Sequence, residues 1–222
     1  MSFPVEIPDQ RGTWVEILEE TELYTFGKKL FRIVQATLRF RKFDGLMSEP
    51  ITRINFERGD SVGVLLHDPS DDVIIFVRQF RYPVLASLKL REKTGYEERM
   101  AWPLEIIAGV SEKDLTVKEV AHKEILEETG YLIKGDLLPI HIIYPSPGGS
   151  SERIHLFLGY VDRRKKEGKG GGVLAEGEDI QVVAIPFAEA MAMIAIGEIN
   201  DAKTIIALQY LALQKVNELP MG

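Results

Sequence analysis

Three glutamates lie close together in a segment whose residues favour a helix. Glu124, Glu127 and Glu128 belong to the stretch Val117–Thr129, which is followed by Gly130, a residue type that commonly terminates helices. At 3.6 residues per turn, Glu124 and Glu128 stack one above the other and Glu127 lies beside them. Carboxylates in this arrangement are suited to binding a hard divalent cation such as Mg²⁺.

The two stacked glutamates fall on the helix face that is expected to point toward the protein. At about 100° per residue, their arc contains the apolar residues Val117, Val120 and Ala121. Like charges four residues apart repel by a few tenths of a kcal/mol in water, and by more when they lose solvent, so a cation should hold them. The alternative is a solvated helix face on which Lys118 and Lys123 pair with the glutamates.

The sequence around this helix resembles the Nudix box, a glycine, five residues, a glutamate, seven residues and then R-E-U-x-E-E-x-G-U, with U aliphatic or aromatic. Here the pattern corresponds to Gly109, Leu115 and the run Lys123–Tyr131. Leu115 replaces the first glutamate, with Asp114 beside it as a candidate substitute. Lys123 replaces the arginine, so the charge is kept but the forked geometry that braces a carboxylate is lost.

The resemblance extends from about Ile51 to Leu213 and indicates the ADP-ribose and GDP-mannose pyrophosphatase branch of the Nudix hydrolases. The segments that carry it are Val77–Arg81, Leu104–Gly109, Ser146–Arg153, Glu176–Ile180 and Ala202–Thr204. It implies hydrolysis of the pyrophosphate bond of a nucleoside diphosphate sugar with Mg²⁺, or with Mn²⁺ as the second candidate. ADP-ribose is our first expectation for the substrate, and GDP-mannose and a UDP-sugar are the alternatives.

The same resemblance implies roles for individual residues. The metal ligands that it implies are the carbonyl of Ala108 and the carboxylates of Glu124, Glu128 and Glu178. The candidate catalytic residues are Glu176, as the general base, and Glu127, which is also a candidate ligand. The substrate contacts that it implies are Arg53, Arg58, Arg81, Glu105, Glu152 and Lys203. Without the resemblance, Glu176 and Glu178 would be assigned to an ordinary acidic loop, and each arginine to a surface ion pair of little value.

The composition is that of an ordinary globular protein, with 45% hydrophobic and 27% charged residues in 222. A formal net charge of -7 argues against nonspecific binding to nucleic acid or to an anionic membrane. No segment reaches the roughly 18 apolar residues of a membrane helix. The absence of cysteine excludes disulfides and thiolate metal sites, and we expect a cytoplasmic protein.

The expected fold is α/β: a Nudix α/β/α sandwich with a mixed sheet, preceded by a small antiparallel β domain. We expect residues 1–57 to form the N-terminal, dimer-forming domain and residues 58–222 to form the hydrolase domain. The strands expected after the N-terminal group are Ser61–Leu66, Val73–Phe80, Leu104–Ala108, Ile140–Ile143, Ile154–Tyr160 and Ile180–Ile185. The helices expected are Val117–Thr129, Phe187–Ile196 and Ala202–Val216, and the loops are Ser87–Met100 and a mobile Lys165–Gly172.

Relatives in this branch form homodimers in which the N-terminal strands of one subunit help to build the substrate site of the other. The resemblance therefore implies a homodimer, with Trp14 or Tyr24 as candidates for stacking on a base and core packing as the alternative role. A Nudix-like domain that senses a nucleotide without cleaving it is the alternative function. The intact glutamates and the lack of a basic helix-turn-helix segment favour the enzyme.

Overall fold

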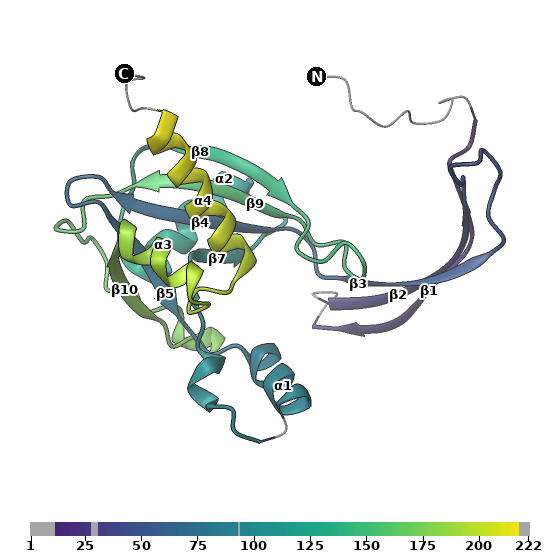
Figure 1. Ribbon diagram of the computed structural model, residues 1–222, viewed down its shortest axis with the longest axis horizontal. Coiled ribbons are helices and arrows are strands. Elements are labelled where there is room, and N and C mark those ends of the chain that lie inside the picture. The colour runs from purple at the N-terminus through teal and green to yellow at the C-terminus, as the bar shows by residue number, and fades with distance from the viewer. Residues whose placement is uncertain (1–11, 28–30, 93, 218–222) are drawn as a thin grey trace. The chain divides into compact units, whose positions relative to one another are not determined.

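The chain, described by a computed structural model over residues 12–27, 31–92 and 94–217, divides into two compact units (Figure 1). The first contains the described residues up to Gly59 together with the loop Ser146–Glu152. The second contains Asp60–Pro145 and the described residues from Arg153 onward. The division expected from the sequence, 1–57 and 58–222, assigns the 146–152 loop to the second domain, whereas in the structure this loop packs within the first unit.

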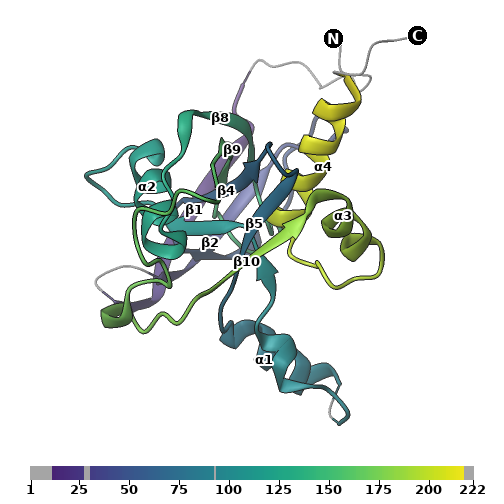
Figure 2. The ribbon, with the colours of Figure 1, turned by 90° about the vertical axis from the view of Figure 1, so that its left-hand side faces the viewer.

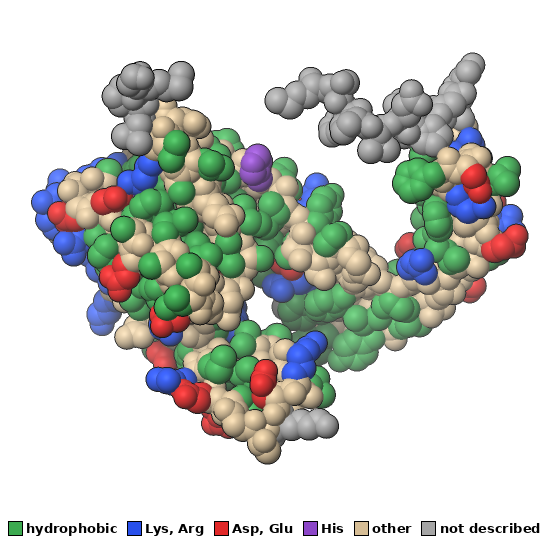
Figure 3. All heavy atoms as spheres, in the orientation of Figure 1, with side chains coloured by type: hydrophobic (Ala, Val, Ile, Leu, Met, Phe, Trp, Pro, Cys, Tyr) green, Lys and Arg blue, Asp and Glu red, His purple; other side chains and the backbone are tan. Residues whose placement is uncertain are grey.

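The N-terminal unit is a three-stranded antiparallel sheet in the order β1-β2-β3. Its strands are β1 (Val15–Phe26), β2 (Phe31–Phe40) and β3 (Ile51–Glu57). The 146–152 loop attaches to β3, where the Phe56 amide donates to the Gly149 carbonyl at 2.8 Å. Every residue of β1 is exposed, and hydrophobic side chains gather on the surface over these strands (Figure 3). The sheet therefore has no buried face of its own along β1.

The second unit is built on a seven-stranded sheet in the order β10-β5-β4-β9-β8, with β6 paired to β5 and β7 paired to β4. Its strands are β4 (Ser61–Asp68), β5 (Val73–Arg78), β6 (Leu104–Glu105), β7 (Ile107–Val110), β8 (Lys134–Ile143), β9 (Ile154–Tyr160) and β10 (Gln181–Pro186). Strands β4 and β9 run parallel, and the other pairs are antiparallel. The mixed sheet expected from the sequence is confirmed.

Helices cover both faces of this sheet (Figure 2). Helix α2 (Val117–Glu124) lies on one face, and α3 (Phe187–Ala195) and α4 (Ala202–Asn217) lie on the other. Because side chains alternate along a strand, Ile74 and Phe76 of β5 pack with α3 and α4, while the intervening Ile75 packs in the cluster that contains α2 residues. The α/β/α expectation is confirmed. Among the described residues, no helix combines the length and apolar character needed to span a bilayer.

The prediction of a loop over Ser87–Met100 was wrong at both ends. Helix α1 (Tyr82–Arg91) continues past Ser87, and a short 3₁₀ helix, η1 (Glu98–Ala101), follows. Pro83 sits in the first turn of α1, where a missing N–H costs nothing, and the remaining residues include good helix formers such as leucine, alanine and lysine. No residue of α1 is buried, so no apolar stripe marks this helix in the sequence.

Candidate active site and metal site

The three glutamates lie on α2 and on the π-helical turn that continues it, η2 (Ile125–Thr129). Thr116 caps the start of α2, because its hydroxyl accepts the Glu119 N–H while the Glu119 carboxylate accepts the Thr116 N–H at 2.7 Å. Gly130 ends the turn in the left-handed conformation with φ 74°, which confirms the expected C-terminal glycine. The sequence did not indicate the π-helical turn, a form that occurs frequently at functional sites.

Glu128 is buried without a partner for its charge. It is 1% exposed, and neither carboxylate oxygen accepts a well-formed hydrogen bond from the described residues. Burial raises its pKa well above the usual range, and the charges of Glu124 and Glu178 raise it further, whereas Arg81 and the Ala108 amide act in the opposite direction. Because a buried ion costs several kcal/mol unless it is paired, these oxygens need a cationic partner.

The Glu124 side chain lies against the backbone of Gly109, the first residue of the Nudix-like pattern. A Cβ atom on Gly109 would lie 2.0 Å from its Oε1 atom, so only glycine leaves room for this carboxylate beside β7. Burial, and next the charge of Glu127, raise the pKa of Glu124 to about 7, while Lys123 acts in the opposite direction. The stacked glutamates therefore face the protein, as their spacing predicted.

The glycine-rich segment after β9 packs against the end of the glutamate turn. The Gly171 amide donates to the Glu128 carbonyl at 2.8 Å. A Cβ on Gly170, whose φ is 66°, would lie 2.6 Å from the carbonyl carbon of Thr129. We expected residues 165–172 to be mobile, but in the structure such backbone contacts anchor the glycines to the turn.

The same segment leads into the acidic loop that was predicted to contribute a metal ligand, Glu178, and the general base, Glu176. Glu178 accepts a hydrogen bond from the Val173 amide at 2.8 Å through Oε2. Glu176 ends an exposed 3₁₀ turn, η3 (Leu174–Glu176). Both carboxylates lie close enough to Glu124 for their charges to raise its pKa. The structure thus brings the loop glutamates and the helix glutamates into one region.

Lys123, which replaces the arginine of the box, is braced by a residue that sequence reasoning missed. Its Nζ atom lies 2.6 Å from Oε1 of Glu112 and 3.8 Å from Oε2 of Glu127. Glu112 therefore supplies a carboxylate partner to Lys123, and the substitution of Asp114 for the glutamate that Leu115 replaces stays a prediction. No sequence pattern marks Glu112, because its pairing depends on the path of the loop between β7 and α2.

Three of the predicted substrate-binding residues meet in the second unit. Glu105 accepts a hydrogen bond from Nε of Arg81 and another from Nζ of Lys203, each at 2.8 Å. Glu105 and Lys203 are buried, and Arg81 is partly exposed. Sequence reasoning missed Asp201, which also pairs with Lys203, although an aspartate directly before a helix is a recognisable cap signal.

The other predicted substrate-binding residues belong to the N-terminal unit. Arg53 is exposed on β3, and its Nη1 atom donates to the Thr52 carbonyl at 2.9 Å. Nε of Arg58 lies 3.5 Å from Oε1 of Glu152. The guanidinium of Arg58 lies 5.8 Å from the centre of the Phe31 ring. Arg58 and Glu152 are therefore brought together, and Arg53 projects separately from the strand.

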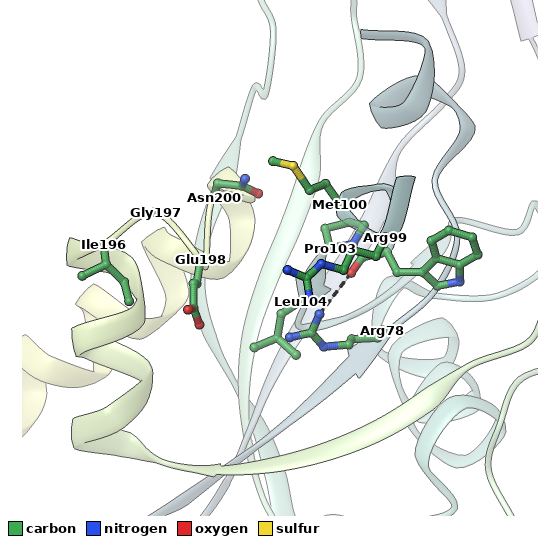
Figure 4. Close-up of a pocket in the computed structure, with 10 residues that line it drawn as sticks. Arg78, Arg99, Met100, Pro103, Leu104, Ile196, Gly197, Glu198 and Asn200 are labelled. Atoms are coloured by element: carbon green, nitrogen blue, oxygen red, sulfur yellow. Dashed lines mark hydrogen bonds between the residues drawn. The ribbon is translucent and has the colours of Figure 1, made fainter. Parts of the chain in front are cut away.

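A hollow of about 390 Å³ lies beside β6 in the second unit (Figure 4). Arg78 and Arg99 point into it, and Arg78 Nη1 donates to the Trp102 carbonyl at 3.4 Å. The turn between α3 and α4 forms the facing wall. None of the residues predicted to act in catalysis, metal binding or substrate binding lines this hollow.

The donor set at the glutamates fits a hard divalent cation. The buried Glu128 and the half-buried Glu124 offer carboxylate oxygens, and Ala108 offers a backbone carbonyl on the adjoining strand. No group of three or more acidic or histidine side chains in the described ranges converges into a complete cage. Mg²⁺ does not require one, since it commonly keeps waters and takes only one or two carboxylates together with substrate phosphates.

Comparison with known proteins places these features in a family. A model described as the NUDIX domain matches residues 57–208. A GDP-mannose pyrophosphatase from Pectobacterium atrosepticum is 39% identical over 155 residues, covering 70% of this chain and 74% of that protein. An ADP-ribose pyrophosphatase from Escherichia coli strain K12 is 34% identical over 201 residues, covering 90% and 88%. The crystal structure of an ADP compounds hydrolase shares the fold, with a TM-score of 0.67 at 18% identity over 93% of this chain and 96% of that one.

Replacing Glu128 with glutamine should stabilise the metal-free protein at alkaline pH by about 1–3 kcal/mol, because a neutral amide then replaces a buried carboxylate that has lost its proton. A second effect comes from Glu124, whose pKa is about 7 in the folded state against 4.5 in the unfolded chain. The folded state binds the extra proton between these values, so the metal-free wild type loses stability as pH rises through that window. Urea unfolding with EDTA and with Mg²⁺ measures both effects, and Mg²⁺ should stabilise only the wild type.

The matched control is Glu127→Gln, one residue earlier, where the carboxylate is partly exposed and near Lys123. This change should not raise the stability of the metal-free protein. Equal gains in stability from Glu127→Gln and Glu128→Gln would contradict the assignment of Glu128 as an uncompensated buried charge.

Replacing Gly109 with alanine should weaken Mg²⁺ binding by about 10–100-fold, because the new methyl group must displace the Glu124 carboxylate. Calorimetric titration with Mg²⁺ measures the loss. Gly148→Ala is the control, since a Cβ there meets open space. An unchanged Mg²⁺ affinity in a folded Gly109→Ala protein would exclude Glu124 from the metal site.

Proposed function

Because this chain belongs to the NUDIX family and is a Nudix hydrolase, we propose that it cleaves the pyrophosphate bond of a nucleoside diphosphate sugar. The products are a nucleoside monophosphate and a sugar phosphate. The observation that carries the proposal is the pair of inward-facing carboxylates, Glu124 and Glu128, the second of them buried with no partner in the described structure. A purely structural domain would have no use for this uncompensated charge.

Divalent metal dependence follows from the family, and we propose Mg²⁺ as the physiological ion, with Mn²⁺ as the second candidate. Glu124, Glu128, Glu178 and the Ala108 carbonyl would hold it. Bound there, the metal supplies Lewis acidity and neutralises charge that develops on the pyrophosphate oxygens. Carboxylate and carbonyl oxygens are ligands that both ions accept.

The remaining roles fall to side chains around these glutamates. Glu176 is our candidate general base, because it lies on an exposed turn while its charge reaches Glu124. Glu127 is the second candidate, and its ion-pair contact with Lys123 orients it. Arg81 supplies a guanidinium to a phosphate of the substrate. From the N-terminal unit, we propose that Arg53, Arg58 and Glu152 bind the rest of the substrate.

ADP-ribose is the first candidate substrate. The ADP-ribose pyrophosphatase from Escherichia coli aligns with 90% of this chain, including most of the N-terminal region. GDP-mannose is the second candidate, because the GDP-mannose pyrophosphatase from Pectobacterium atrosepticum is more similar, at 39% identity, over a shorter alignment. The two relatives favour different nucleotides, so the choice requires a direct comparison of substrates.

We further propose that the chain works as a homodimer through its N-terminal sheet. Ile17, Leu23 and Tyr24 on β1 are 53–59% exposed, and a three-stranded sheet needs a packing partner to be stable. A second copy of the same sheet supplies one. We propose a small-molecule substrate, no nucleic-acid or membrane partner, and a cytoplasmic location, consistent with a net charge of -7 and a cysteine-free sequence.

We expect the wild-type protein to release a nucleoside monophosphate from ADP-ribose faster than from GDP-mannose or UDP-glucose when Mg²⁺ is present. Glu128→Gln should reduce this rate by at least ~100-fold, because the transition state loses its metal. Glu189→Gln, an exposed position on α3, is the matched control and should keep full activity. Tight nucleotide binding without metal-dependent release of a monophosphate would contradict the enzyme and favour a sensor.

Light scattering of the wild-type protein should give twice the 25.0 kDa mass of one chain. Ile17→Lys should yield the single-chain mass, because a charge then replaces an exposed apolar side chain of β1. Glu16→Lys changes the neighbouring, oppositely directed side chain and serves as the control. A monomeric wild type, or a dimer unaffected by Ile17→Lys, would contradict this interface.

A further inference from the structure

A chain of alternating charges connects three elements of the second unit. It runs from Arg81, which follows β5, to Glu105 on β6 and then to Lys203 in the first turn of α4. Arg81 Nε and Lys203 Nζ each lie 2.8 Å from a different oxygen of Glu105. Lys203 Nζ also lies 3.0 Å from Oδ2 of Asp201. The two positive and two negative charges of this network therefore balance.

Arg81 is the cation of this network whose donors are most accessible to a ligand. The side chains of Glu105 and Lys203 are 7% and 9% exposed, and each oxygen of Glu105 already accepts one hydrogen bond. Arg81 is 35% exposed and is bonded through Nε. Its two terminal nitrogens make no hydrogen bond to the described residues. Glu105, to which Arg81 is bonded, lies three residues before Ala108, whose carbonyl is a candidate metal ligand, so these free donors lie in the region of the proposed metal site.

The contact between Lys203 and Glu105 determines how Arg81 hydrogen-bonds to Glu105. An unrestrained arginine and carboxylate commonly form a forked pair with two parallel hydrogen bonds. Such a pair would use a terminal nitrogen of Arg81 and the second oxygen of Glu105. The ammonium of Lys203 already lies on that oxygen at 2.8 Å and repels a second cationic donor there, and Arg81 bonds to Glu105 through Nε.

The first turn of α4 holds Lys203 in this position. Asp201 caps the helix, because its Oδ2 atom accepts the Thr204 amide at 3.0 Å and the Thr204 hydroxyl at 2.6 Å. The same hydroxyl accepts the Ile106 amide at 2.9 Å, next in sequence to Glu105. The helix start is thus bonded to the residue that directly follows Glu105.

We infer that Glu105 and Lys203 are positioning residues, which do not touch the substrate but keep the terminal nitrogens of Arg81 available to its diphosphate. This rests on the proposed function. It also replaces the expectation that Glu105 and Lys203 contact the substrate directly. Without Lys203, Arg81 folds into a forked pair with Glu105 and loses donors for phosphate.

A double-mutant cycle tests this assignment, with KM, kcat and the affinity for ADP measured in the presence of Mg²⁺. Arg81→Gln should raise KM and weaken ADP binding, and Lys203→Met should do the same by about 10-fold. The double variant should be no weaker than Arg81→Gln alone, because Lys203 acts only through Arg81. Lys203→Arg keeps a cationic donor on Glu105 and should restore most of the affinity.

Two matched controls separate this effect from a general loss of charge or of stability. Lys215→Met removes a lysine from the same helix that pairs with Asp72, and Arg78→Gln removes an arginine that donates to the Trp102 carbonyl beside the hollow in Figure 4. Both should leave KM and ADP affinity unchanged. Thermal unfolding of each variant reports any structural damage independently of KM.

Additive effects of Lys203→Met and Arg81→Gln would overturn the inference, because Lys203 would then contact the substrate itself. A lower melting temperature with unchanged KM and ADP affinity in Lys203→Met would overturn it in favour of a purely structural role. In both cases wild-type turnover would leave the proposed function standing. A wild-type chain that neither binds ADP nor turns over a nucleotide sugar would instead overturn the proposed function, and the positioning role with it.

Discussion

The burial of the Glu128 carboxylate is the constraint on which the rest of the site depends. At 1% exposure, and with no well-formed hydrogen bond to either oxygen from the described residues, its ionised form is unfavourable in the metal-free protein. Glu124, one turn earlier, adds a second charge of the same sign, and its own pKa is raised to about 7. We propose that a divalent metal compensates these charges during function.

Much of the local structure makes room for this arrangement. Gly109 lacks the Cβ that would collide with Glu124, and Gly170 lacks the one that would collide with the backbone of the glutamate turn. The capping box at Thr116 fixes where α2 begins. The glycine segment then bonds to the end of the turn and delivers the acidic loop with Glu178. Backbone packing, more than side-chain pairing, therefore positions the carboxylates.

The glutamate helix was predictable because its information is local. The spacing of Glu124 and Glu128, the apolar stripe beside them and the terminal Gly130 all lie within a few turns of one another. The mixed sheet was implied by the family resemblance, and the apolar patterns indicated where its strands lie. By contrast, α1 was missed because none of its residues is buried, so its sequence has no periodic stripe. The packing of the 146–152 loop with β3 depends on a contact nearly 100 residues away in sequence.

The same distinction separates the side chains that were foreseen from those that were not. Glu112 pairs with Lys123 across a loop, and Glu105 and Lys203 meet although they are 98 positions apart. Such pairs arise from the folded path of the chain and leave no spacing in the sequence. The family resemblance named Arg81, Glu105 and Lys203 among six expected substrate contacts, whereas their contacts with one another are visible only in the folded structure.

Anomalous diffraction from crystals soaked with Mn²⁺ tests most directly whether the buried carboxylates form a metal site. We predict a peak within coordination distance of the carboxylates of Glu124 and Glu128 and the carbonyl of Ala108, and its loss in Glu128→Gln crystals under the same conditions. The assignment of a metal site to these carboxylates would be contradicted by an ordered wild-type site with no metal at these oxygens. It would also be contradicted by a protein cation paired with Glu128 in place of the metal.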